Sequence, residues 1–126
     1  MNMRTPLGKV RGLGSAKDGT EHFWHQRLTA VANVPLVLIG LYLVVSLTGA
    51  PYSEVYQTLS SPLAAIFLFL FSFSVLSHMR LGMQVVIEDY VHGEFTKVLL
   101  VMFNTFFVMF TGALILYAIF KLSFGG

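Results

Sequence analysis

The chain alternates between long apolar runs and short polar connections. Three runs are long enough to cross a bilayer, because a hydrocarbon core of about 30 Å needs roughly 20 helical residues. These runs cover about 28–48, 62–87 and 98–120. The connection at 49–61 is rich in Gly, Pro and Ser and predicts a short polar turn, and the connection after the second run reads EDYVHGEFTK. The pattern predicts an all-α membrane protein with three transmembrane helices.

The composition agrees with a membrane protein and excludes several chemistries. Hydrophobic residues make up 56% of the chain and charged residues 11%, whereas soluble domains carry about 25% charged residues. The chain has no cysteine, so it holds no disulfide, thiolate metal site or iron–sulfur cluster by itself. Its few basic residues are not interleaved with aromatic ones, so nucleic acid is not an expected partner.

Lysine and arginine positions set the expected orientation. Residues 1–27 carry most of them, the first connection has none, the second has Lys97 and the C-terminal tail has Lys121. The positive-inside rule then places the N-terminus inside and the C-terminus outside. We expect a basic lead-in at the inner surface, residues 1–26, followed by a three-helix anchor domain, residues 27–122. The lead-in has no apolar h-region, so a cleaved signal peptide is not expected.

His78 is an ionisable side chain near the middle of the second run. On a helix with about 100° per residue, Gly82 and Ser74 fall within about 40° of His78, whereas Arg80 falls about 200° away on the other face. An ionisable residue at this depth is a functional hypothesis, and neutral imidazole is a natural ligand for haem iron. The alternative is a histidine that is bonded to a backbone carbonyl of a neighbouring helix.

A six-coordinate haem requires a second axial ligand besides His78. His22 and His25 precede the first span, and His92 follows the second. None of these three can lie opposite a side chain in mid-membrane. If haem is bound, its other ligand comes from another polypeptide or from a second copy of this chain, so the sequence predicts a partner.

Four further residues mark the predicted inner boundary of the membrane. Asp89 and Tyr90 are expected to end the second helix, just beyond the apolar run, with Asp89 about 20° from His78 around the helix. A tyrosine hydroxyl can donate a hydrogen bond to a quinone carbonyl, and a carboxylate can relay the protons that quinone reduction consumes. Arg27 is placed for a haem propionate or the quinone mouth, and Trp24 for a wall of a quinone pocket. Each residue also has a plain interpretation, as a surface acid, an aromatic-belt residue or an interface anchor.

Two stretches resemble the small membrane-anchor subunit of succinate dehydrogenase, respiratory complex II. The first is HMRLGMQVVIEDYVHG at 78–93, and the second is EHFWHQRLTAVANVPL at 21–36, which includes Arg27 and Thr29. The three-span layout with the N-terminus inside also matches, and the resemblance covers roughly residues 20–121. The chain looks like the small cytochrome b subunit of the D type, in the bacterial form close to the mitochondrial one.

The resemblance implies a non-catalytic subunit of a succinate:quinone oxidoreductase, which links the tricarboxylic acid cycle to the respiratory chain. Its implied partners are a flavoprotein subunit that oxidises succinate, an iron–sulfur subunit and a second cytochrome b anchor subunit. Haem b would lie between the two anchors, with the bacterial inner membrane favoured over the mitochondrial one. The chain itself lacks a nucleotide-binding glycine pattern and cluster ligands, so it does not oxidise succinate.

The resemblance also implies roles for individual residues by position. His78 would be an axial ligand of the haem iron, and Arg27 would lie near the haem propionates and the quinone mouth. Tyr90 would hydrogen-bond the carbonyl of ubiquinone, and Asp89 would support the proton route beside it.

Several features receive no role from this comparison. Arg80 stands where an apolar or aromatic residue is expected, and the roles of His22, His25 and His92 are not assigned. Two other functions stay open at this point. One is a b-type cytochrome anchor of fumarate reductase or of another respiratory dehydrogenase, and the other is a small membrane transporter. A transporter would want an acidic residue in mid-span, whereas the mid-span ionisable residues here are His78 and Arg80.

Overall fold

The computed structural model describes residues 5–12 and 18–125. Five helices follow one another in these residues: α1 (Pro6–Val10), α2 (Asp18–Leu47), α3 (Tyr52–Leu59), α4 (Pro62–Tyr90) and α5 (Glu94–Phe124). Helices α2, α4 and α5 are long and apolar enough to cross a membrane. The predicted all-α fold with three transmembrane helices is confirmed.

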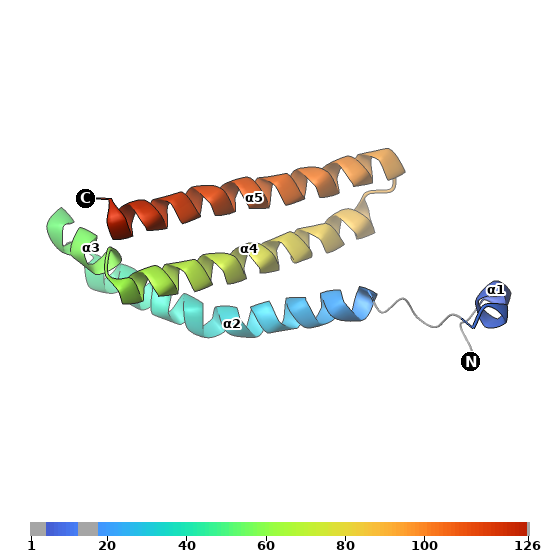
Figure 1. Cartoon of the computed structure of the whole chain (residues 1–126), viewed down its shortest axis with the longest axis horizontal. Helices are drawn as coiled ribbons and strands as arrows, with labels where there is room; N and C mark the ends of the chain where they lie inside the picture. The colour runs from blue at the N-terminus through green and yellow to red at the C-terminus, as the bar shows by residue number, and fades with distance from the viewer. Residues whose placement is uncertain (1–4, 13–17, 126) are drawn as a thin grey trace.

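Helix α4 is the central helix of the bundle. It packs against α2 on one side and against α5 on the other, and it runs antiparallel to both (Figure 1). Helices α2 and α5 begin, and α4 ends, at one end of the bundle, which we name the proximal end (Figure 1). Helix α3 and the end of α5 lie at the opposite, distal end. Different faces of α4 therefore meet different neighbours.

The local sequence sets both ends of α4. Ser61 caps its start by accepting a hydrogen bond from the backbone N–H of Ala64 at 3.3 Å, and Pro62 follows at a position where a missing N–H costs nothing. Tyr90 ends the helix, and Val91–Gly93 alone connect it to α5. The EDY segment therefore completes a helix at the proximal end and is not part of a loop.

The predicted polar turn between the first two spans contains a helix, α3. Glu54 in its first turn favours a helix start, and Val55 and Leu59 are half-buried toward the bundle. The eight residues of α3 are mostly polar, and only two apolar side chains point inward, so their composition resembles that of a polar turn. The helical structure of α3 therefore depends on packing against α4 and α5, which the segment alone does not reveal.

The first long helix begins within the expected lead-in. Helix α2 starts at Asp18, and α1 forms a separate short helix capped by Thr5, whose hydroxyl accepts from Gly8 N–H at 3.1 Å. Residues 1–4 and 13–17 of the lead-in lie outside the described residues. Helix α2 also runs without a break through Pro35, and it curves along its length (Figure 1).

Few side chains of the bundle are buried, and half of those are polar. The buried residues are Ala64, Ser74, Ile87 and Asn104. Many large apolar side chains on all three long helices are exposed. Because lipid tails are as apolar as leucine, helices in a membrane associate through close packing and interhelical hydrogen bonds. Ser74 and Asn104, the two buried polar residues, are therefore expected to make hydrogen bonds between the helices.

Asn104 ties α5 to α4. Its Nδ2 donates to the backbone carbonyl of Arg80 at 3.0 Å. Two turns further along α5, a Cβ added at Gly112 would lie 3.4 Å from Leu76 Cδ1, so the glycine keeps the two helices close. A single polar bond and a small residue thus define this contact.

Replacing Asn104 by leucine is expected to weaken the α4–α5 contact by about 1 kcal/mol, a typical strength for an interhelical hydrogen bond in a membrane. The measurement is the thermal unfolding midpoint of the detergent-purified protein. Thr105→Val is the matched control, because the Thr105 hydroxyl donates to Val101 O of its own helix at 3.0 Å. An Asn104→Leu midpoint equal to that of the wild type would contradict this account of the contact.

Candidate functional site

The centre of the candidate site is His78, which lies on the side of α4 that faces α2. Its Nδ1 is 3.2 Å from Thr29 Oγ1 on α2. The same hydroxyl donates within its own helix, to His25 O at 2.9 Å and Gln26 O at 3.1 Å. One turn before His78, the hydroxyl of Ser74 donates to the backbone carbonyl of Thr29 at 3.4 Å. The imidazole is thus held by a side-chain hydroxyl, where the sequence-based alternative expected a backbone carbonyl.

The imidazole also lines a cavity of about 510 Å³ between α2 and α4. The lining residues from α2 include His22, Gln26, Arg27 and Ala30, and α4 adds Leu81 beside His78. The α2 residues belong to its proximal part, so the cavity runs from the imidazole toward the proximal end. It brings His78, in the middle of α4, to the same space as His22 and Arg27 near the start of α2, and we refer to it as the His78 cavity.

Arg27 brings a positive charge to the His78 cavity. Its guanidinium carbon lies 5.0 Å from the centroid of the Phe23 ring, one turn earlier on α2, so a cation–π contact helps to position it. The described residues form one ion pair, in which Lys97 Nζ lies 3.6 Å from Glu94 Oε1. No described carboxylate of this chain therefore neutralises Arg27.

Gly82 lies on the His78 face of α4, as predicted, and its neighbour is Gln26. A Cβ added at Gly82 would lie 3.4 Å from Gln26 Nε2, so the glycine makes room for this amide between the helices. Gln26 Oε1 is buried and has no hydrogen-bond partner among the described residues. A buried amide oxygen without a partner in the lining of a cavity is available to a donor that the described residues do not provide.

The other predicted site residues lie at the proximal end and face outward. Tyr90 is 77% exposed and Trp24 is 64% exposed. Asp89 is exposed as well. None of the three lines the His78 cavity. The single chain therefore brings Arg27 and His78 to one cavity and leaves the other three side chains open to a partner or to water.

Arg80 lines a different cavity from His78, as the helical spacing predicts. It lines a second cavity of about 620 Å³ together with His25, Ser77 and, from α5, Val108. The residue is exposed, and its backbone carbonyl is the acceptor for Asn104. The structure explains how this segment of α4 is held but gives the Arg80 side chain no chemical role.

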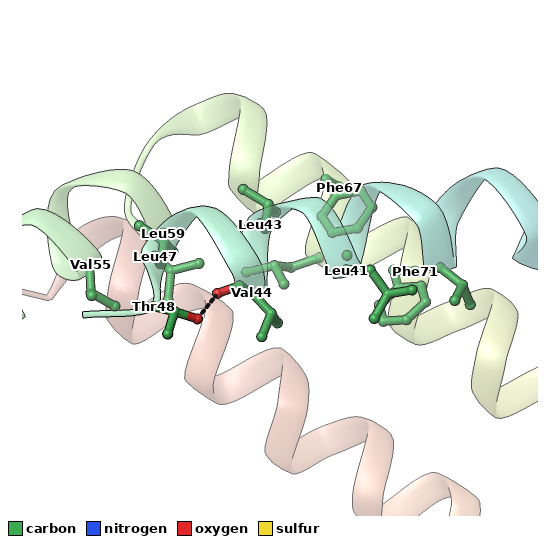
Figure 2. A pocket seen from close by; sticks show the side chains of 12 residues that line it. Leu41, Leu43, Val44, Leu47, Thr48, Val55, Leu59, Phe67 and Phe71 are labelled. Atoms are coloured by element: carbon green, nitrogen blue, oxygen red, sulfur yellow. Dashed lines mark hydrogen bonds between the residues drawn. The ribbon is translucent and has the colours of Figure 1, made fainter. Parts of the chain in front are cut away.

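A third cavity, of about 570 Å³, lies at the distal end between α2, α3 and α4 (Figure 2). The side chains that surround it are mainly apolar, with Phe67 and Phe71 on one wall and Val55 and Leu59 on another. Thr48 is the labelled polar residue, and its hydroxyl donates to Val44 O of its own helix at 2.8 Å (Figure 2). This lining offers no group for redox or proton chemistry, so the His78 cavity is the better candidate.

Sequence reasoning gave no role to Thr29, Gln26 or His22, which all contribute to the His78 cavity or its contact. His22, Gln26 and Thr29 follow one another at spacings of four and three residues, so they share one face of α2, whereas Arg27 lies about 200° around the helix from Thr29. The sequence signal that could have found them is the placement of these three polar residues at helical spacing at the start of an apolar run.

Comparison with known proteins gives a consistent result. The model of the family described as "Succinate dehydrogenase/Fumarate reductase transmembrane subunit" matches residues 1–120. The succinate dehydrogenase membrane anchor subunit of Reclinomonas americana is 35% identical over 65% of this chain and 71% of its own length. The hydrophobic membrane anchor subunit of Rickettsia bellii succinate dehydrogenase is 36% identical over 71% of this chain and 72% of its own length.

The relative from Paracoccus denitrificans, again a succinate dehydrogenase hydrophobic membrane anchor subunit, spans almost the whole chain. It is 29% identical over 98% of this chain and 92% of its own length. No solved structure matches the chain. The family model and the three apolar helices show a multi-pass membrane protein, and the transporter alternative is set aside. The chain belongs to the family of succinate dehydrogenase and fumarate reductase transmembrane subunits, which confirms its resemblance to succinate dehydrogenase membrane anchors.

Proposed function

We propose that this chain is the small membrane anchor of a succinate dehydrogenase, in which it holds one side of haem b and forms part of the ubiquinone-reduction site. A membrane anchor implies the catalytic subunits as partners, and we take these to be a flavoprotein and an iron–sulfur subunit, with a second cytochrome b anchor beside this chain. One observation carries the proposal. The ring of His78 is fixed by Thr29 and lines a cavity that also contains Arg27.

The His78 cavity has the chemistry that a b-type haem requires. His78 would offer a ring nitrogen to the iron, Ala30 and Leu81 would offer apolar contacts to the porphyrin, and Arg27 would pair with the propionates. Within the described residues no three His, Cys, Asp or Glu side chains gather where they could hold a metal ion. A haem shared between two anchors needs only one axial side chain from each.

The second axial ligand is expected from the partner anchor. His22 lines the same cavity as His78 but lies roughly 10 Å along α2 from Thr29, at 1.5 Å per residue. At that distance along the helix, His22 would not serve as the second axial ligand beside His78. His92 lies in the connection after α4, and His25 lines the Arg80 cavity. Neither of these residues is placed to face His78.

The proximal end provides the groups for quinone reduction. Tyr90 is exposed there and can donate its hydroxyl proton in a hydrogen bond to a quinone carbonyl. Asp89 precedes it and is exposed to water, so its carboxylate can pass protons to the same site. Trp24 is proposed as a wall for the quinone ring, and Arg27 lies between this end and the His78 cavity. When bound, the haem supplies a one-electron redox centre close to this site.

The charge distribution supports a cytoplasmic location for the proximal end. Arg27 and Lys97 lie there, whereas Lys121 is near the distal end of α5. Under the positive-inside rule the proximal end faces the cytoplasm, where the soluble subunits would dock. The proposed membrane is the bacterial inner membrane.

Haem binding is tested on the purified, detergent-solubilised complex. A low-spin b-haem absorption band is expected in the wild type, increasing in its reduced form after succinate is added, and the band is expected to be absent in His78→Ala. His92→Ala is the control and should keep the band. A complex without haem, or a His78→Ala complex with an unchanged spectrum, would overturn the haem assignment.

Quinone binding is tested separately with Tyr90→Phe. Loss of one hydrogen bond is expected to lower ubiquinone reductase activity about tenfold. Succinate oxidation with a soluble artificial electron acceptor should be unchanged, because that acceptor does not need the membrane site. Tyr117→Phe, near the distal end of α5, is the control. Equal ubiquinone reduction by wild type and Tyr90→Phe would remove Tyr90 from the proposed site.

A further inference from the structure

We infer that Thr29 is the positioning residue for His78: its hydroxyl accepts a hydrogen bond from Nδ1–H, which fixes the ring and leaves the lone pair of Nε2 for the iron. This inference rests on the proposed function, because it concerns the ring's use as a haem ligand. It assigns a role to a side chain that the family resemblance left without one.

The distances determine which group donates. A threonine hydroxyl has one proton and two lone pairs. Thr29 Oγ1 lies 2.9 Å from His25 O and 3.1 Å from Gln26 O, and carbonyl oxygens can only accept. The hydroxyl proton therefore points back along α2, shared between the two carbonyls. At 3.2 Å from the same oxygen, the His78 Nδ1 must supply the proton of the remaining hydrogen bond.

This assignment selects one tautomer of His78. A neutral imidazole with its proton on Nδ1 has its lone pair on Nε2. The opposite arrangement would take the hydroxyl proton away from the two α2 carbonyls and place a proton on Nε2, which would then be unable to bind iron. Metal-bound histidines commonly donate their other ring N–H to an oxygen, and this fixes both tautomer and orientation.

The acceptor is itself held firmly in place. The backbone carbonyl of Thr29 accepts from the hydroxyl of Ser74 at 3.4 Å, and Ser74 is only 7% exposed. Ser74 lies one turn before His78 on α4, so the two helices are joined at two adjacent levels. Thr29 is therefore fixed relative to His78 both through its side chain and through its backbone.

The hydrogen bond should also tune the haem. A donor bond from Nδ1–H makes the imidazole a stronger electron donor, which favours the ferric state of the iron. Removal of the acceptor should therefore raise the midpoint potential of the haem. It should also free the ring to rotate, which changes the g values of the ferric low-spin signal in electron paramagnetic resonance.

The test compares four forms of the assembled, purified complex: wild type, Thr29→Val, Thr29→Ser and Thr105→Val. Valine has nearly the shape of threonine but no hydroxyl, and serine keeps the hydroxyl. Thr105 is the matched control, since its hydroxyl donates to Val101 O of its own helix. For each form the haem content, the haem midpoint potential and the ferric g values are measured.

The expected result is a higher midpoint potential and altered g values in Thr29→Val, with a haem affinity about tenfold lower. Thr29→Ser and Thr105→Val should match the wild type in all three measurements. A Thr29→Val complex with wild-type potential and g values would overturn the inference.

Two further outcomes are also decisive. If Thr29→Val does not assemble, Thr29→Ala is measured in its place, and failure of both apolar variants would assign Thr29 to helix packing alone and overturn the inference. Absence of haem from the wild-type complex, or retention of its spectrum in His78→Ala, would instead overturn the proposed function. The two failures are therefore distinguishable.

Discussion

A polar contact between α2 and α4 holds the candidate site together. In hydrocarbon, an imidazole or hydroxyl without a partner is costly, because no water is present to replace the lost hydrogen bond. His78 and Thr29 satisfy each other across the two helices, and Ser74 adds a second bond one turn away. A shift of α2 by one residue would rotate Thr29 by about 100° and break both contacts. The register of the two helices is thus set by polar pairing. Arg27 lines the His78 cavity from a different side of α2, since it lies about 200° around the helix from Thr29.

The outer surface of the bundle is mainly apolar, as expected for a protein that anchors a complex in a membrane. Large apolar side chains are exposed along all three long helices, and Tyr90 and Trp24 face outward at the proximal end. Lipid can cover the apolar surfaces, but the buried oxygen of Gln26 has no hydrogen-bond partner among the described residues. Under the proposed function, neighbouring subunits would supply the remaining groups of the site.

The sequence predicted the parts that follow from helix geometry and bilayer thickness. The three spans follow from the length of the apolar runs. The separation of His78 from Arg80 follows from 100° per residue, and the two residues do line different cavities. The contribution of Thr29 was not visible, because a threonine in an apolar helix is ordinary and its contact depends on the register between two helices. Helix α3 was missed because its eight residues resemble a polar turn in composition.

The proposed roles of Asp89 and Tyr90 do not depend on contacts within this chain, since both residues are exposed and their site would be completed by other chains. The most direct test of the account is therefore a structure of the intact complex by electron cryo-microscopy. The account predicts a haem between the two anchors, with His78 Nε2 bonded to the iron and Nδ1 within hydrogen-bond distance of Thr29 Oγ1. An iron bonded to other residues, or a His78 that faces lipid, would contradict it.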